Sequence, residues 1–152
     1  MSKAKDSLNE LLVNVFNYIT NIEAILIRKM GVKLSINEVH IIEAIALTKT
    51  PTMSNVAKRL LITVGTLTTA INRLVNKGFV TRYQDEKDRR KVYLELTEKG
   101  YETKAKHDRF HDEMIEQVIR DMHIDENSEL MVALENLQTY FHELYAERMK
   151  SL

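Results

Sequence analysis

Several features that would point to other classes of protein are missing from this chain of 152 residues. It contains no cysteine, which excludes disulfide bonds, thiolate metal sites and thiol redox sensing. Its apolar runs are interrupted and shorter than the roughly 20 residues that a helix needs to span a bilayer, and the N-terminal residues lack the apolar core of a secretory signal. Because 44% of its residues are hydrophobic, it has enough apolar material for a core. We expect a single cytoplasmic domain over residues 1–152, with no membrane partner and no cofactor.

Acidic residues are missing from one long part of the chain, although the net charge of the whole is zero. Residues 49–91 hold ten bases and three acids, a net charge of +7, whereas residues 92–152 hold seven bases and fourteen acids, a net charge of −7. No acid occurs in the 41 residues from Ala44 to Gln84. A solvated helical face normally mixes both signs, so this segment predicts a surface that binds phosphates, with an ordinary solvated face as the alternative.

Helical periodicity is strongest at the two ends of the chain. Apolar residues recur at spacings of three and four over residues 7–30, which predicts a helix that begins with a capping box at Ser7 and Glu10 and stops at Gly31. Two more helices are predicted after residue 97. One ends near Met122, and the other is capped by Asp125 and carries the same apolar spacing.

A second capping box, formed by Ser35 and Glu38, opens a helix that ends near Thr48 because Pro51 follows. Two short helices joined by about three residues come next, which is the pattern of a helix-turn-helix. The first covers residues 53–60, and the second runs from residue 63, its N-cap, to residue 77. The inward residues expected on these three helices are Val39, Ile42, Ile45, Ala46, Val56, Ala57, Leu60, Val64, Leu67, Ile71 and Leu74.

After Gly78 the apolar pattern changes from a helical period to that of a strand. Residues 79–83 and 91–96 predict two strands of a β-hairpin, joined by a charged loop. A helix-turn-helix followed by a hairpin is a winged helix, here over residues 35–96. We therefore expect a mainly α fold with a small β-hairpin wing, an α+β winged helix-turn-helix flanked by dimerisation helices over residues 7–30 and 98–150.

The apolar seams of the terminal helices have too little partner surface within one winged helix. Burial against a second copy would satisfy both, which predicts a two-fold homodimer. The predicted interface residues are Leu8, Leu12, Val15, Ile19, Leu134, Leu137, Phe141 and Leu144.

The outward face of the second short helix is acid-free and carries short side chains that form hydrogen bonds. It suits a major groove, where threonine can contact thymine methyls or phosphates, asparagine can bond adenine, and arginine can bond guanine. Gly65 near the helix start would let free amides approach a phosphate. The residues of this recognition helix predicted to contact double-stranded DNA are Gly65, Thr66, Thr68, Thr69, Asn72, Arg73 and Lys77, with Asn76 on the same face.

The loop of the hairpin supplies a second predicted DNA contact, because arginines on a projecting tip can enter a minor groove. Asp88 is negative, so we assign it to holding Arg90 by an ion pair or to fixing the turn. The predicted wing residues are Lys87, Asp88, Arg89, Arg90 and Lys91.

These motifs resemble the MarR family of bacterial winged-helix regulators, and the similarity covers nearly the whole chain. It is carried by Asp88-Arg-Arg90 and Leu96-Thr-Glu-Lys-Gly100, downstream of residues 64–74 and of Lys77-Gly-Phe-Val80. The resemblance implies a homodimer on a roughly palindromic operator, with recognition helices in successive major grooves and wings in the flanking minor grooves. Thr69 stands where many members carry arginine, so the resemblance implies no base preference there.

Within the family, residues 107–114, His-Asp-Arg-Phe-His-Asp-Glu-Met, are similar to repressors of bacterial fatty-acid synthesis genes. That similarity implies an acyl-carrier protein loaded with a long acyl chain as corepressor. The chain would need an apolar slot, and the acidic carrier should dock on basic residues away from the acidic C-terminal segment. The expected effector pocket consists of Phe16, Ile19, His107, Phe110, His111 and Met114.

Other functions stay open at this point. His107 and His111 are spaced to bind Zn²⁺ from one helix face, with His40, His123 or His142 as a third ligand, although we assign no metal site. Another small ligand could equally be the effector. We expect no enzyme, because the chain has no glycine-rich phosphate loop, no serine in a nucleophile elbow and no cysteine. A protein-interaction adaptor that does not bind DNA is the remaining class.

Overall fold

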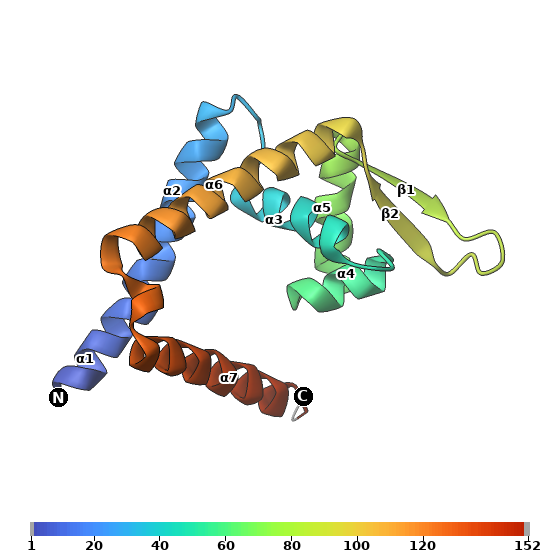
Figure 1. Cartoon of the computed structure of the whole chain (residues 1–152). Helices are drawn as coiled ribbons and strands as arrows, with labels where there is room; N and C mark the ends of the chain where they lie inside the picture. The colour runs from blue at the N-terminus through green and yellow to red at the C-terminus, as the bar shows by residue number, and fades with distance from the viewer. Residues whose placement is uncertain (1, 151–152) are drawn as a thin grey trace. The chain divides into compact units, whose positions relative to one another are not determined.

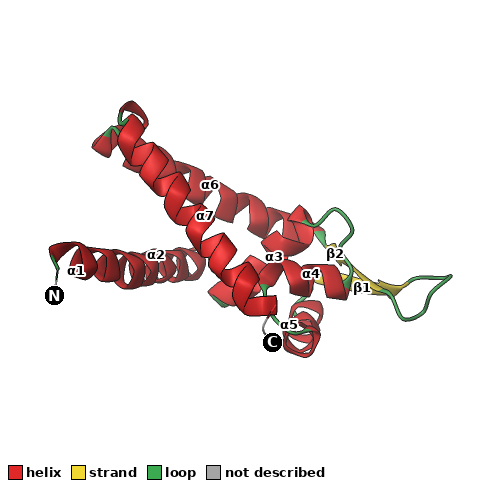
Figure 2. Cartoon of the chain, turned by 90° about the horizontal axis from the view of Figure 1, so that it is seen from below, coloured by secondary structure: helices red, strands yellow, loops and turns green. Residues whose placement is uncertain are grey.

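The computed structural model of the chain describes residues 2–150, which divide into two compact units, Met1–His107 and Asp108–Leu152. The border between them falls inside one helix, α6 (Glu98–Met122). Helices dominate both units, and the described residues contain one two-stranded antiparallel sheet (Figure 2). This confirms the mainly α fold with a β-hairpin wing.

The N-terminal helix is longer than predicted. It runs continuously through α1 (Lys3–Glu10), a π-helical turn (Leu11–Val15) and α2 (Phe16–Lys29). The predicted capping box at Ser7 is wrong, because Ser2 caps the helix by accepting a hydrogen bond from the backbone N–H of Lys5. The predicted end is confirmed by the left-handed conformation of Gly31, whose φ is +69°.

By length and composition alone, this continuous helix could cross a membrane. Two of its residues, Glu23 and Ile27, are buried inside the first unit, so one face of the helix belongs to the interior of the protein. On its other faces large apolar side chains are exposed, which matters for the proposed dimer below. The exposed members are Leu8, Leu11, Leu12, Val13, Val15, Phe16, Tyr18, Ile22 and Ile25.

Helix α3 (Ile36–Leu47) begins with the predicted capping box, which the structure confirms. The Ser35 hydroxyl accepts from the Glu38 N–H at 3.3 Å, and the Glu38 carboxylate accepts from the Ser35 N–H at 2.8 Å. One inward assignment is wrong: Ala46 is exposed, whereas Ala44 is buried in the core. The buried face also includes Ile41, because α3 is covered on a wider arc than a single apolar stripe predicts.

The helix-turn-helix consists of α4 (Met53–Leu60) and α5 (Val64–Asn76), within a residue of the predicted bounds. The turn contains a left-handed residue that is not glycine, Leu61, with φ of +59°. Val64 was expected inward but is 45% exposed, because it is the first residue of α5 and lies beyond the core. The core of the first unit consists of Ile41, Ile42, Ala44, Ile45, Val56, Ala57, Leu67, Ile71, Leu74, Phe79, Val80, Leu94 and Leu96.

Strands β1 (Val80–Gln84) and β2 (Val92–Leu96) form the antiparallel hairpin, with Val80 opposite Leu96 and Gln84 opposite Val92. Both begin one residue later than predicted. Their base is anchored in the core through Val80 and Leu94, and the loop extends away from helices α3–α5 of the same unit (Figure 1). The hairpin therefore presents its tip as a wing.

In the second unit, α7 (Ser128–Lys150) begins three residues later than the predicted cap. Asp125 was expected to cap it, but that residue lies in a short 3₁₀ turn, Ile124–Glu126. Asn127 caps α7 instead, its side-chain oxygen accepting from the Leu130 N–H at 3.0 Å.

Candidate nucleic-acid interface

The outward face of α5 is exposed as predicted. Gly65, Thr66, Thr69, Asn72 and Arg73 are exposed, and Thr68 is half-buried. The opposite face is fully buried, so α5 is held firmly by its apolar side. The hydroxyls of Thr68 and Thr69 donate to the helix backbone at Val64 and Gly65, at 2.8 and 3.4 Å. This face is rigid and carries no acid.

The N-terminal end of α5 has features of an anion site. Thr63 caps the helix, accepting from the Thr66 N–H at 3.1 Å. Gly65 has no internal reason to be glycine: its φ is not left-handed, and a Cβ there would meet only the Thr63 hydroxyl oxygen, at 3.8 Å. The space beside the free N–H groups in the first turn of α5 is therefore open to a phosphate from a bound molecule.

The wing and the recognition helix are joined by a contact that the sequence analysis missed. The Arg82 guanidinium on β1 donates to the Asn72 side-chain oxygen on α5 at 2.6 Å. Strand alternation contained the signal: Arg82 shares its face with the buried Val80 and so points to the side of the hairpin that meets α5. Arg82 thus orients an amide that we predict to contact a base.

Lys77 lies at the opposite end of α5 from Gly65 and is engaged within the protein. Its ammonium donates to both carboxylate oxygens of Glu38, at 2.8 and 2.9 Å, tying the end of α5 to the start of α3. Burial tends to raise the pKa of Glu38, but hydrogen bonds from Lys77 and Ser35 and the Lys77 charge outweigh it and hold that pKa below its ordinary value. This gives Lys77 a structural role beside the predicted DNA contact.

The wing loop is organised by its two aspartates. Asp85 accepts from the backbone N–H groups of Lys87 and Asp88, both at 2.8 Å, and these bonds hold the pKa of Asp85 below its usual range. Asp88 accepts from Arg90 twice, from the backbone N–H at 3.2 Å and from Nε at 3.1 Å. Both predicted roles of Asp88, the ion pair and the turn, are confirmed. The side chain of Arg90 stays 92% exposed.

The junction between the wing and α6 is formed by the segment Leu96-Thr-Glu-Lys-Gly100. Thr97 donates from its hydroxyl to the Gly78 carbonyl at 2.7 Å and accepts from the Gly100 N–H at 3.2 Å. Gly100 packs so closely that a Cβ would lie 2.4 Å from the Phe79 carbonyl oxygen. The threonine and the glycine together fix where the hairpin leaves the core.

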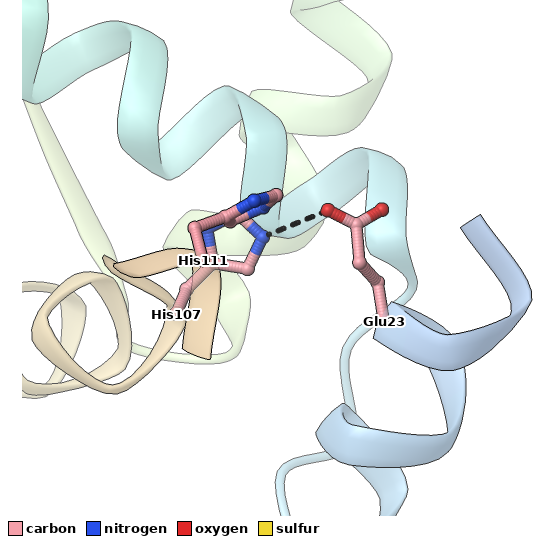
Figure 3. Close-up of side chains that lie close together, drawn as sticks. All are labelled: Glu23, His107 and His111. Atoms are coloured by element: carbon pink, nitrogen blue, oxygen red, sulfur yellow. Dashed lines mark ion pairs between the residues drawn. The ribbon is translucent and has the colours of Figure 1, made fainter. Parts of the chain in front are cut away.

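A polar cluster lies inside the first unit, on α2, α3 and α6. The Glu23 carboxylate oxygen Oε1 is 3.4 Å from His107 Nε2 and 3.6 Å from His40 Nε2. Glu23 and His107 are almost wholly buried, and their ion pair is drawn in Figure 3 with His111, which follows one turn later on α6. The sequence analysis missed Glu23, although it replaces an apolar residue in the stripe between Ile19 and Ile27.

The other predicted effector and interface residues have varied environments within their own units. Phe16 is 68% exposed, whereas Ile19, Phe110, His111 and Met114 are half-buried. The predicted interface residues of α7 and the N-terminal helix are all exposed or half-buried, and none is buried in its own unit.

Known proteins with the same arrangement can now be compared. The model of the MarR family matches residues 34–92, from α3 through the wing. The structure of FabT from Streptococcus pneumoniae in complex with DNA is 37% identical, with a TM-score of 0.83, over 92% of this chain and 99% of that one. The chain belongs to the MarR family. This membership makes it a winged-helix transcriptional regulator rather than an enzyme.

Two further relatives differ in how much of the chain they match. The structure of AbsC, a MarR family transcriptional regulator from Streptomyces coelicolor, is 21% identical with a TM-score of 0.76, over 97% of both chains, and shows the shared fold. The uncharacterized HTH-type transcriptional regulator YkoM of Bacillus subtilis is 37% identical over 82 residues. That match spans about half the length of each protein, 54% of this chain and 53% of YkoM.

Proposed function

We propose that the protein is a homodimeric repressor that binds a pseudo-palindromic operator in double-stranded DNA through α5 and the wing, and so acts in the cytoplasm at the nucleoid. The observation that carries the proposal is the full-length similarity to FabT, whose structure holds DNA, combined with an acid-free α5 face on this chain. A protein that is 37% identical and whose structure holds DNA supports DNA binding by this chain.

The homodimer is supported by the exposure of large apolar side chains on the N-terminal helix and on α7, each within its own unit. Leu8, Leu12, Leu134 and Phe141 are each 40–44% exposed. Because each of these side chains is already more than half buried, covering the rest of it against a second copy would contribute about 1 kcal/mol. Light scattering at micromolar concentration tests this step, and a monomer would contradict it.

The regulated genes and the effector form the finer part of the proposal. We place the protein among repressors of fatty-acid synthesis, with an acyl-carrier protein carrying a long chain as corepressor. Support comes from the similarity to FabT and from the 107–114 segment. The residues proposed to contact the effector are those assigned from the sequence: Phe16, Ile19, His107, Phe110, His111 and Met114.

Two measurements test DNA binding and its target. Sequencing the genomic fragments that the purified protein retains should recover promoters of fatty-acid synthesis genes. Operator affinity should also fall linearly with the logarithm of salt concentration, because phosphate contacts release counterions. An adaptor that does not bind DNA would retain no fragments. Retained fragments without those promoters would leave a DNA-binding regulator with other target genes.

The polar cluster in the first unit favours a second candidate, a repressor that responds to Zn²⁺. In a tetrahedral site with Zn–N and Zn–O distances near 2.0 Å, neighbouring ligand atoms lie about 3.3 Å apart. The separations of 3.4 and 3.6 Å from Glu23 to His107 and His40 suit that spacing. Calorimetry with Zn²⁺ and operator binding at several Zn²⁺ concentrations separate the candidates. No binding of Zn²⁺ at micromolar affinity would exclude the Zn²⁺-responsive repressor. Operator affinity that changes with Zn²⁺ concentration would favour Zn²⁺ over the acyl-carrier protein as the effector.

A further inference from the structure

A basic hollow lies in the first unit at the C-terminal end of α5. It has a volume of about 360 Å³ and is lined by Gly31, Val32, Lys33, Lys77, Phe79 and Lys99. Three of these six residues are bases, and none is an acid. The operator-binding surface proposed above needs neither Lys33 nor Lys99.

Two of the three ammonium groups are held in place. Lys99 donates to the Lys77 carbonyl at 3.1 Å and lies 4.1 Å from the centre of the Phe79 ring. Lys77 is fixed by Glu38, as described above. An ammonium has three N–H donors, so a fixed lysine can still meet an anion while losing little side-chain entropy on binding.

The basic character continues along the chain beside the hollow. Residues 24–37 contain three bases, Arg28, Lys29 and Lys33, and no acid. All three are exposed. Glu98, beside Lys99, is an exposed acid adjoining this surface in sequence. A second acid, the buried Glu38, is paired with Lys77. The four exposed cations Arg28, Lys29, Lys33 and Lys99 outnumber the exposed acid, and the surface suits a partner that presents several carboxylates or phosphates.

The position of the hollow suits a corepressor. A corepressor must bind while the operator is bound, so its docking surface has to lie away from the DNA contacts. The hollow is at the end of α5 opposite Gly65, and a helix of 13 residues is about 20 Å long. Of the predicted DNA contacts, Lys77 lines this hollow, and its ammonium is already bound to Glu38. A partner docked there leaves the first turn of α5 free for DNA.

We propose that the surface made by Lys33 and Lys99 at this hollow, with Arg28 and Lys29 just before it in sequence, is the docking site of the acidic acyl-carrier protein. This inference rests on the proposed function, because it names where the proposed corepressor binds. Charge complementarity selects the occupant: the carrier is acidic, and the net −7 segment of this chain repels it.

The test compares two charge-reversal variants in the full-length protein. Lys29→Glu with Lys33→Glu changes the proposed surface, and Lys3→Glu with Lys5→Glu makes the same change in charge on α1. All four side chains are exposed, so both variants should fold, which thermal unfolding checks. Fluorescence anisotropy on operator DNA is then measured with palmitoyl-loaded acyl-carrier protein, with carrier lacking the acyl chain, and with inorganic phosphate.

We expect the loaded carrier to strengthen operator binding by the wild type and by the α1 variant. For the Lys29/Lys33 variant, the carrier concentration needed should rise about tenfold, and operator affinity without carrier should stay unchanged. An equal carrier response in all three proteins overturns the docking site but leaves the proposed function intact. No response in the wild type overturns both, and an equal response to phosphate alone would replace the carrier by a small anion.

Discussion

Replacing Gly65 with alanine should make the protein more stable and a weaker operator binder at the same time. The added Cβ meets only one atom, 3.8 Å away, so it causes no clash within the chain. Alanine favours a helix over glycine by up to about 1 kcal/mol, and less in the first turn, so we expect a gain of about 0.5 kcal/mol. For a chain of this size that raises the melting temperature by about 1–2 °C.

The effect on DNA should have the opposite sign. The methyl group would occupy the space through which a phosphate reaches the free amides at the start of α5. We expect operator affinity to fall about tenfold, measured by anisotropy at fixed salt, with melting followed on the same samples. If stability rises and affinity is unchanged, the space beside Gly65 is not used by DNA and the reasoning is wrong.

Gly100 provides the matched control, because it is also a helical glycine. Its Cβ would lie 2.4 Å from the Phe79 carbonyl oxygen and 3.2 Å from Leu96 Cβ, so the backbone at the base of the wing must shift. Gly100→Ala should therefore destabilise the protein by about 1–3 kcal/mol, and its melting temperature should fall. A rise in both alanine variants would mean that helix propensity alone decides their stability.

Three further predictions concern the contacts around α5 and the wing. Glu38→Gln should cost about 1–2 kcal/mol in urea unfolding at pH 7, because the ion pair with the partly exposed Lys77 is lost. The pKa of Glu38 in the folded protein is lowered from 4.5, so the difference in unfolding free energy between the wild type and this variant should be full above pH 4.5. It should vanish as the pH falls through the folded pKa, and a difference that is equal at every pH would contradict this. Arg82→Ala should weaken operator binding by about 1 kcal/mol with little loss of stability, because the Asn72 amide loses the partner that orients it. Equal losses of affinity for the operator and for a random duplex would argue against this orienting role. Arg90→Ala should weaken operator binding by about 1–3 kcal/mol if the exposed Arg90 guanidinium enters a groove. Competition anisotropy measures this loss, and a variant that binds the operator as tightly as the wild type would exclude the contact.

Sequence patterns predicted the elements of the first unit well because local chemistry decides them. The Ser35 capping box, the Thr63 cap and the helix end at Gly31 each involve residues a few positions apart, and all three are confirmed. The bounds of the two strands were predicted to within one residue for the same reason. Element ends failed where two caps competed, as with Ser2 over Ser7.

Contacts between residues distant in sequence could not be predicted in the same way. Glu38 and Lys77 are separated by 39 positions, and only the packing of α3 on α5 brings them together. Arg82 with Asn72 depends likewise on how the hairpin lies beside α5. Periodicity gives the face on which each residue lies, but it does not give the partner that lies opposite that face.

The two aspartates of the wing have a consequence for the entropy of recognition. A loop of charged residues that became ordered only on DNA would lose backbone freedom of about 1–2 kcal/mol per residue at the moment of binding. Asp85 and Asp88 accept four hydrogen bonds within the loop, three of them from backbone amides, so much of that ordering occurs during folding. The acids of this loop thus serve as its internal scaffold, and in the minor-groove contact that we predict, the wing would bind with its shape already set.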